Sequence, residues 1–377
     1  MLSLLDLSAA FDTIDHDILL DRLKLSFGIR GKVLEWFGSY IKGRTQSVVI
    51  DKYSSNPILL NFGVPQGSVL GPILFSLYSQ PLSNIIRSHQ LFFHQYADDT
   101  QLYTSVCPTN ISSAINSLSK CVTDVSSWMS SNKLKLNESK TEIILIGTTQ
   151  KLKSLDIKMV DICGEDISIS TKVRNLGVIM DSNLTMAYHI SNLRKLCYLE
   201  LRKISYIRKY ITIEATNKLI CSFVLSRLDY CNSLHAGITS TQVHKLQQIQ
   251  NSAARLIMQV PKREHITPTL ELLHWLPIKY RILYKIASLV YQCLYDPDFP
   301  SYLKEFVYLY KPQRTLRSAN KNLLLKPRFK LKTFGTRTFS FQAAEIWNTL
   351  PDSILHSQSL SVFKNNLKTY FYNIHYC

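Results

Sequence analysis

Two adjacent aspartates, Asp98 and Asp99, lie in the stretch "QYADDTQLYTS", with apolar and aromatic residues on both sides. The flanking residues favour extended strands, so the pattern predicts a hairpin whose turn carries both acids. Like charges this close repel, and each carboxylate resists leaving water. Because Asp is also a common turn residue, an ordinary polar turn is one interpretation and a cation-binding site is the other.

A third carboxylate bears on that choice. The stretch "LSLLDLSAAF" predicts a short strand that ends near Asp6, directly before a helix. If this strand shares a sheet with the acidic hairpin, Asp6, Asp98 and Asp99 converge at one edge. Such a cluster suits two Mg²⁺ ions, with Mn²⁺ as an alternative, because hard cations take carboxylate and phosphate oxygens. Two ions roughly 3.5–4 Å apart stabilise the attacking and leaving oxygens of a phosphoryl transfer.

Two further segments carry groups suited to a nucleotide. "GVPQGSVLGP" at 63–72 is a turn rich in Gly and Pro that feeds a helix, and amides at a helix start can meet phosphate or ribose. "LKLNESKTEIILIG" places Asn137 and Lys140 just before a strand. A lysine there could protonate a leaving pyrophosphate, a contribution of about 10²–10⁴-fold. A structural loop and a solvated surface lysine are the competing interpretations.

Five segments follow the order and approximate spacing of the palm motifs of reverse transcriptases. They are "LLDLSAAFDTIDHDILLDRL", "GVPQGSVLGPILFSLYSQPL", "YADDTQLY", "LKLNESKTEIILIG" and "NLGVIMDSNLTMAYHI". The sequences of these motifs are most similar to those of LINE-type, non-LTR retrotransposons of the Jockey-like group. The resemblance covers about 1–185 and extends more loosely through "LHWLPIKYRILYKIASLVYQCLY" and "RTFSFQAAEIWNTLPDSI". A group II intron maturase or a telomerase-like protein shares the palm, but its motif sequences match these five segments less well.

The resemblance implies a role for each matching residue. Asp6 and Asp98 would be the principal metal ligands, with Asp99 beside them. Phe11 would be a steric gate that favours deoxynucleotides, although without the family an ordinary core Phe would be preferred. The other implied residues are Gln66 and Gly67 for the incoming nucleotide, Lys140 for catalysis, and Leu176 and Gly177 for the primer end.

The order of predicted elements indicates an α+β fold. We expect a polymerase palm, an antiparallel sheet with packed helices whose fingers are mostly missing, followed by an all-helical thumb and C-terminal region. Clustered prolines at 261–277 and 297–312 suggest boundaries. The predicted domains are the reverse transcriptase palm at 1–185, a helical thumb at 186–260, and a basic, mainly helical C-terminal region at 261–377.

The net charge of +17 is unevenly distributed. Residues 1–150 carry 12 basic and 12 acidic residues, and the remaining 32 basic and 15 acidic residues lie in 151–377. That excess fits nucleic acid, although solvated helical faces also collect Lys and Arg. The resemblance implies an RNA template, a DNA primer, their hybrid and deoxynucleoside triphosphates as partners. The candidate contacts, where aromatics interleave with basic residues, are 202–210, 311–317 and 326–332.

Other signals concern the compartment. No run of 18 apolar residues appears and the N-terminus lacks a basic region, which predicts no membrane span and no secretory signal. The eight cysteines form no C-x-x-C pair, which indicates a reducing compartment and argues against a zinc site. We therefore expect an intracellular protein of the nucleus or cytoplasm.

The sequence differs from the resembling family at its N-terminal end. Asp6 lies almost at the N-terminus, whereas the family carries fingers ahead of this strand and an endonuclease further upstream. We expect an RNA-directed DNA polymerase fragment, a nucleotidyltransferase that uses two metal ions to extend a primer 3′-hydroxyl, weak or inactive alone. The alternative is a non-catalytic, nucleic-acid-binding remnant of a retrotransposon polymerase.

Overall fold

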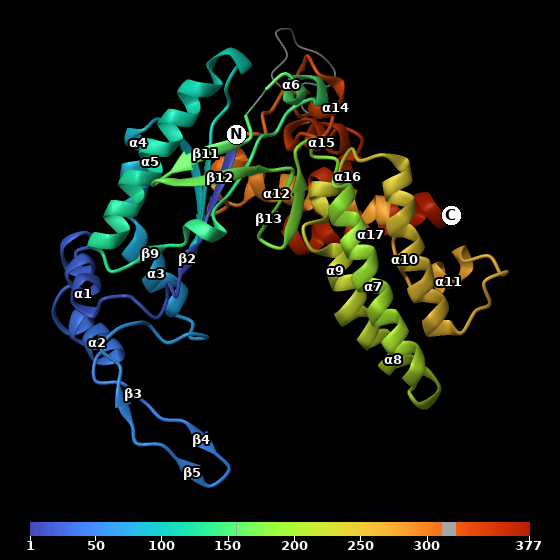
Figure 1. Cartoon of the computed structure of the whole chain (residues 1–377). Helices are drawn as coiled ribbons and strands as arrows, with labels where there is room; N and C mark the ends of the chain where they lie inside the picture. Colours follow the sequence, from blue (N-terminus) through green and yellow to red (C-terminus); the bar gives the residue numbers. More distant parts are fainter. Residues whose placement is uncertain (156, 311–321) are drawn as a thin grey trace. The chain divides into compact units, whose positions relative to one another are not determined.

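The computed structural model describes residues 1–155, 157–310 and 322–377. The chain divides into two compact units, Met1–Leu184 (unit 1) and Thr185–Cys377 (unit 2). Figure 1 shows the elements of each unit along the chain. Among the helices that the structure describes, none combines the length and the apolar character needed to cross a membrane.

A six-stranded sheet forms the centre of unit 1. Its strands are β1 (Leu2–Leu5), β7 (Phe92–Tyr96), β8 (Asp99–Tyr103), β10 (Glu142–Ile144), β11 (Met159–Ile162) and β12 (Glu165–Ser170). Their order in the sheet is β11-β12-β10-β1-β8-β7, so β1 lies inside the sheet (Figure 1). β1 is antiparallel to both β8 and β10, whereas β10 runs parallel to β12.

The two faces of the sheet carry different apolar clusters. Leu5, Leu102 and Ile143 belong to the larger core, and Leu2 and Ile144 to a smaller cluster. Because successive side chains of a strand point to opposite faces, Ile143 belongs to the larger core and its neighbour Ile144 to the smaller cluster. A one-residue slip would exchange the two faces, and this pattern therefore specifies the register.

Helices bury the larger core. Those of unit 1 are α1 (His16–Leu25), α2 (Gly31–Ile41), α3 (Gly71–Ser79), α4 (Leu82–Ser88), α5 (Ile111–Ser131) and α6 (Thr149–Lys153), with the 3₁₀ turns η1 (Pro108–Asn110) and η2 (Glu138–Lys140). Asp15 caps α1 by accepting hydrogen bonds from two amides of its first turn. α5 contributes Leu118, Val122 and Val125, which are all fully buried and recur at helical spacing.

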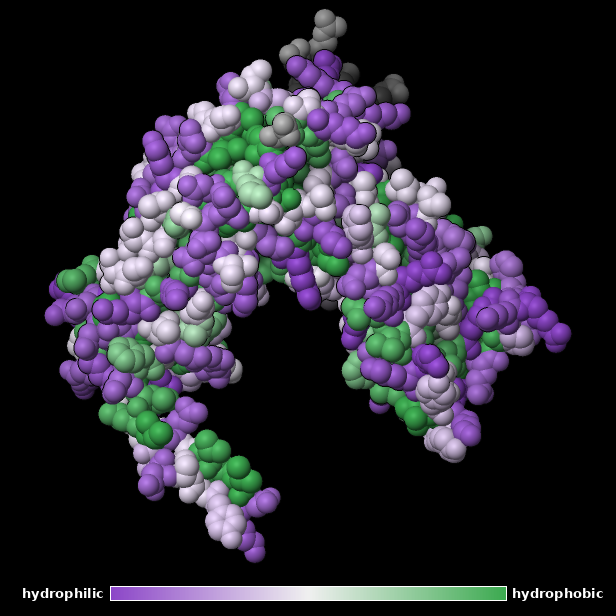
Figure 2. All heavy atoms as spheres, in the orientation of Figure 1, coloured by the Kyte–Doolittle hydropathy of each residue, from purple (hydrophilic) through white to green (hydrophobic). Residues whose placement is uncertain are grey.

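Four short strand pairs complete unit 1. They are β2 (Leu7–Ser8) with β9 (Lys135–Leu136), β3 (Thr45–Gln46) with β6 (Ile58–Leu59), β4 (Val49–Ile50) with β5 (Tyr53–Ser54), and β13 (Lys172–Asn175) with β14 (Val178–Asp181). Residues 45–59 form a hairpin that we call the arm (Figure 1). Hydrophobic side chains lie on its surface (Figure 2), and Val49, Ile50, Tyr53 and Ile58 are each more than half exposed.

Unit 2 is predominantly helical. Its α-helices are α7 (Ala187–Ile207), α8 (Ile213–Ile220), α9 (Ser226–Asp229), α10 (Ser240–Met258), α11 (Thr267–Leu272), α12 (Ile278–Tyr295), α13 (Ser301–Lys304), α14 (Lys332–Gly335), α15 (Phe339–Trp347), α16 (Asp352–Leu355) and α17 (Leu360–Tyr376). Three tighter or wider turns join them, namely the 3₁₀ turns η3 (Arg208–Tyr210) and η5 (Asn232–His235) and the π-helical turn η4 (Cys221–Leu225).

Aromatic packing holds the C-terminal helices of unit 2 together. α12 packs against both α15 and α17. Trp347 and Phe363 are fully buried, and the ring centroids of Phe363 and Tyr291 lie 4.5 Å apart in a stacked arrangement. Large aromatic side chains dominate core energetics, which explains how these amphipathic helices form one compact unit.

The expected α+β fold is confirmed, with the predicted acidic hairpin at β7 and β8 and a helical second half. The division between units follows Leu184, and the palm is predicted to end at 185. The domain assignments themselves, including a boundary between thumb and C-terminal region near 260, stay predictions.

Candidate active site

Three carboxylates lie at adjoining strand ends in unit 1. β1 pairs with β8 so that Leu5 faces Thr100, which sets Asp6 beside Asp99. Tyr96 faces Asp99 across the β7–β8 hairpin, and Asp98 therefore lies in the turn between them. Alternation along the strands puts the side chains of Asp6 and Asp99 on the same side of the sheet.

The electrostatics of this cluster fit a cation. Burial and then the negative charges of Asp98 and Asp6 hold the pKa of Asp99 above its ordinary value. The Oδ2 atom of Asp6 is buried and accepts no hydrogen bond. A positive charge would relieve both features, and carboxylate oxygens are the donors that Mg²⁺ prefers.

The carboxylates do not form a ready-made set of ligands. Within residues 1–155, 157–310 and 322–377, no three side chains of His, Cys, Asp or Glu are grouped closely enough to hold a metal ion. Mutual repulsion is the physical reason to expect like charges to turn apart. Rotation of these side chains toward a common point would be needed for ion binding.

Lys140 lies beside Asp6. The pairing of Leu7 with Leu136 brings the end of β9 to this point, where the Asn137 amide donates to the Asp6 carbonyl oxygen at 2.9 Å. The turn η2 follows at once and places the Lys140 Nζ 3.5 Å from the Asp6 Oδ2. The lysine side chain is 69% exposed, and its charge is therefore screened by water. The structure thus places Lys140 beside Asp6, with Asp98 and Asp99 at the adjoining strand ends.

The predicted nucleotide-contacting residues lie on two neighbouring loops. Phe11 lies in the turn after β2, half-buried, with its ring centroid 5.0 Å from that of Phe75. Its carbonyl oxygen accepts from the Val64 amide at 2.9 Å. Gln66 is exposed, and its Nε2 lies 2.8 Å from each carboxylate oxygen of Asp12. The pattern of residue types alone did not single out Asp12, because nothing in it specifies this contact.

Gly63 fixes the distance between these two loops. Its φ is +85°, and a Cβ built there would lie 2.9 Å from the Cα of Asp12. Its carbonyl oxygen is 2.8 Å from the Nε2 of His16 and accepts from the Nη2 of Arg44 at 2.6 Å. Only glycine permits this backbone conformation and this approach without strain. Gly67, with φ of +77°, has open space around it.

The predicted primer-binding residues form the turn of a hairpin. Asn175 pairs with Val178, and both intervening residues, Leu176 and Gly177, have positive φ. Such a turn matches the right-handed twist of its strands. Asn175 also exchanges two side-chain hydrogen bonds with Gln101 of β8, at 2.8 and 3.0 Å. This amide pair links the hairpin to the strand that carries Asp99, a link that the sequence did not indicate.

Comparison with known proteins identifies a family for the first 180 residues. The model of the family "Reverse transcriptase (RNA-dependent DNA polymerase)" matches residues 1–180. Residues 1–180 are a reverse transcriptase domain. This domain contains every residue predicted for catalysis, nucleotide contact and primer contact.

Relatives of this reverse transcriptase domain occur in non-LTR retrotransposons. The chain is 26% identical over 271 residues to a probable RNA-directed DNA polymerase from transposon BS of Drosophila melanogaster. It is 26% identical over 265 residues to the RNA-directed DNA polymerase from mobile element jockey of Drosophila funebris. Each alignment covers 68% of this chain, and 29% and 28% of those relatives, so the chain spans under a third of their length. The predicted Jockey-like relationship is confirmed.

The chain was also compared with a solved structure of telomerase from Candida albicans in complex with a fragment of telomeric RNA. The alignment covers 81% of this chain and 48% of the telomerase chain. The TM-score is 0.33 at 15% identity, and a likeness of that size carries no argument.

The basic stretches predicted to contact nucleic acid lie outside the reverse transcriptase domain. Within 202–210, Arg208 is 8% exposed, and its guanidinium donates to three backbone carbonyls, including those of Leu256 and Ile257 of α10. A buried arginine of this kind satisfies carbonyls at a helix end. Lys209 is exposed over the ring of Tyr210. Residues 326–331 are irregular and mostly exposed, and 311–317 lie outside the described residues.

Proposed function

We propose that the chain is part of an RNA-directed DNA polymerase that adds deoxynucleotides to a primer 3′-hydroxyl on an RNA template. The observation that carries this proposal is the pairing of β1 with β8, which sets Asp6 beside the Asp98–Asp99 turn. The membership of residues 1–180 in the reverse transcriptase family supports it. An RNA template would place the reaction in the nucleus or the cytoplasm.

Asp6, Asp98 and Asp99 would hold two Mg²⁺ ions, with Mn²⁺ as an alternative. The Oδ2 of Asp6, which is buried and accepts no hydrogen bond, and the raised pKa of Asp99 support this ligand set. When bound, the ions would supply the positive charge that nucleotidyl transfer needs at the attacking and leaving oxygens. The chain itself contributes the positions of three carboxylates at adjoining strand ends.

Other residues would bind and orient the reactants. Lys140 would give a proton to the leaving pyrophosphate, a role that its position beside Asp6 supports. Phe11 would crowd a ribose 2′-hydroxyl, and Gln66 and Gly67 would contact the incoming nucleotide. The turn at Leu176 and Gly177 would hold the primer end, and the amide pair between β8 and β13 supports that placement.

The basic residues of unit 2 would bind the phosphates of the RNA–DNA hybrid. Residues 185–377 carry 27 basic and 10 acidic residues, which accounts for the whole net charge of +17. Contacts of this type are largely independent of sequence. A chain that keeps these contacts but extends primers weakly, or not at all, would be the non-catalytic alternative.

A primer-extension assay with the purified chain separates the two functions. The substrate is poly(rA) with an oligo(dT) primer, with dTTP and Mg²⁺ present. We expect incorporation that Asp98→Asn lowers by about a hundredfold or more, because one lost electrostatic contact to the transition state has that effect.

The matched control is Asp166→Asn, an exposed carboxylate of β12 in the same unit. This variant should retain full incorporation. Hybrid binding that is sensitive to salt, without incorporation by the unmodified chain, would support the non-catalytic alternative. Incorporation that survives Asp98→Asn would contradict the proposed site.

A further inference from the structure

Unit 2 has a half-open cavity of about 450 Å³ next to the π-helical turn η4. Cys221 and Leu225, the two ends of that turn, both line it, and α12 forms another wall. Small-molecule sites have volumes of roughly 300–1,000 Å³. π-turns recur at functional sites because the wider turn changes the direction of side chains. Both features mark this cavity as a candidate binding site.

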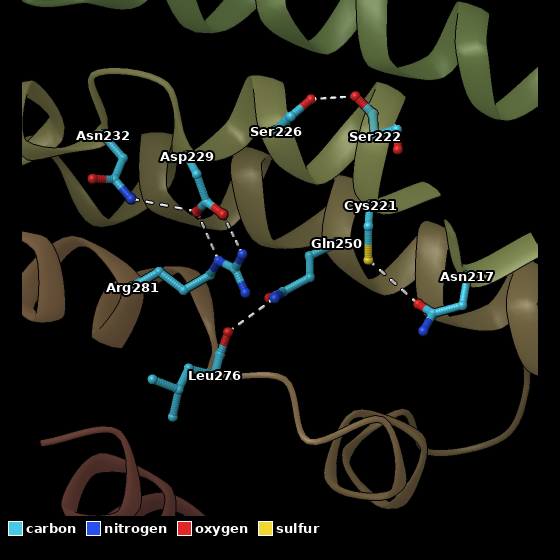
Figure 3. Close-up of polar contacts among 9 residues, drawn as sticks. All are labelled: Asn217, Cys221, Ser222, Ser226, Asp229, Asn232, Gln250, Leu276 and Arg281. Atoms are coloured by element: carbon cyan, nitrogen blue, oxygen red, sulfur yellow. Dashed lines mark hydrogen bonds and ion pairs between the residues drawn. The ribbon is translucent and has the colours of Figure 1, made fainter. Parts of the chain in front are cut away.

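The cavity has a surplus of positive charge. Arg281 is paired with Asp229 through two hydrogen bonds, one of them from Nε to Oδ1 at 2.9 Å (Figure 3). That pair is close to neutral. Lys285 and Lys368 also line the cavity, and neither forms an ion pair within the described part of the chain. An anionic group is therefore the ligand that the charges favour.

A buried amide in the same wall contacts the carboxylate of Asp229. Asn232 is 5% exposed, and its Nδ2 is turned toward Asp229, with 3.4 Å to Oδ1 (Figure 3). This contact helps to hold the carboxylate that pairs with Arg281. Asp229 is therefore engaged by its neighbours within the wall and does not offset the charges of the two lysines.

Aromatic side chains complete the lining. Trp275 and Tyr284 both line the cavity, and Trp275 is 6% exposed. Flat rings of this kind stack on nucleobases without regard to their sequence. The ligand suggested by the whole set carries a phosphate and a flat ring.

We propose that this cavity binds one nucleotide, its phosphate at Lys285 and Lys368 and its base against Trp275 and Tyr284. A free nucleotide and a single unpaired nucleotide within a strand share this chemistry. The inference does not rest on the proposed polymerase function, because every residue of the cavity belongs to unit 2.

Protection of Cys221 from alkylation tests the proposal in the full chain. Cys221 is exposed and lines the cavity, and the exposed Cys163 of unit 1 is the internal control. A pulse of iodoacetamide with and without AMP is followed by mass spectrometry of the peptides. At ten times the Kd of AMP, alkylation of Cys221 should slow about tenfold, because only the free protein reacts, while Cys163 is unaffected.

Charge variants locate the phosphate. Lys285→Gln combined with Lys368→Gln should weaken AMP binding by about tenfold or more, as expected for the loss of charged hydrogen bonds. The matched control combines Lys279→Gln with Lys364→Gln, on the same two helices and outside the cavity lining. An equal loss in the control pair would overturn the proposal, because the effect would then be general surface charge.

The protection of Cys221 by AMP is compared with the protection by ribose 5-phosphate, which lacks the base, and by a single-stranded oligo(A). Protection by ribose 5-phosphate as strong as that by AMP, or no protection by either AMP or oligo(A), would overturn the proposal. Stronger protection by oligo(A) at equal nucleotide concentration supports a nucleotide within a strand. Equal protection by AMP and oligo(A) supports a free nucleotide. None of these readouts uses primer extension, so they are independent of polymerase activity.

Discussion

The charges around single residues determine what chemistry the candidate active site can support. Asp99 has its pKa raised by burial and by two neighbouring carboxylates, whereas Lys140 brings a positive charge to Asp6. These opposed effects are what a site for phosphoryl transfer needs, because it must hold cations and supply a proton. Sequence reasoning could find these residues, since Asp6 lies at a predicted strand end, Asp99 in a predicted hairpin turn and Lys140 just before a predicted strand.

Lys140 is testable on its own. Lys140→Gln should lower the turnover of primer extension by about 10²–10⁴-fold, the usual range for loss of general acid help, with little change in the KM for dTTP. Lys135→Gln, an exposed lysine of the neighbouring β9, is the matched control. Similar small losses in both variants would identify Lys140 as an ordinary surface lysine.

His235 predicts a pH-dependent stability in unit 2. Burial, and then the charge of His189, lowers the pKa of His235 to about 4, and neither ring nitrogen has a hydrogen-bond partner in the described residues. The unfolded chain takes up a proton near the ordinary pKa of about 6.5, while the folded chain does not. Stability is therefore full above about pH 6.5 and falls toward pH 4, by at most about 3 kcal/mol.

Urea unfolding at a series of pH values measures this effect. His235→Leu should flatten the fall in unfolding free energy between about pH 6.5 and 4, because the protonation difference is removed. The control is His265→Gln, an exposed histidine of the same unit, which should leave the slope unchanged. An unchanged slope in His235→Leu would show that other groups cause the pH dependence.

At the scale of elements, loops and hairpins are held by contacts between distant segments. The Gln101–Asn175 pair joins β8 to β13, and the Gln66–Asp12 pair joins two loops. The strands and hairpins were predictable from alternation and turn residues, which act locally. These amide contacts were not, because they depend on the register of strands far apart in sequence. The buried position of Arg208 could not be predicted for a related reason: composition indicates a basic surface, but not which arginine meets a buried helix end.

The approach of the two loops at Gly63 is also testable. Gly63→Ala adds a Cβ that would lie 2.9 Å from backbone atoms of Asp12, in a residue with positive φ. Gly67→Ala is the matched control, since it has a similar φ and open space. We expect the control to lose roughly 1–2 kcal/mol from the left-handed backbone alone. Gly63→Ala should lose clearly more, measured by urea unfolding, and equal losses would mean that the loops adjust easily.

For the whole molecule, charge separates the two units. Unit 2 carries the entire net charge of +17, while the carboxylates lie in unit 1. If six to ten phosphates are neutralised, the affinity for an RNA–DNA hybrid should fall by about 10³–10⁵ between roughly 50 and 200 mM salt. Fluorescence anisotropy with a labelled hybrid measures the slope. A flat salt response would contradict phosphate contacts as the main source of affinity.

The place of β1 in the sheet has a consequence for synthesis of the protein. β1 begins at residue 2, yet its neighbours β8 and β10 end at residues 103 and 144. Ribosomes add about 5–20 residues per second, so roughly seven to thirty seconds pass before the second neighbour, β10, has been made. During that time the edge of β1 that pairs with β10 is open to wrong partners. Chaperones that shield a nascent strand would matter most for these first residues.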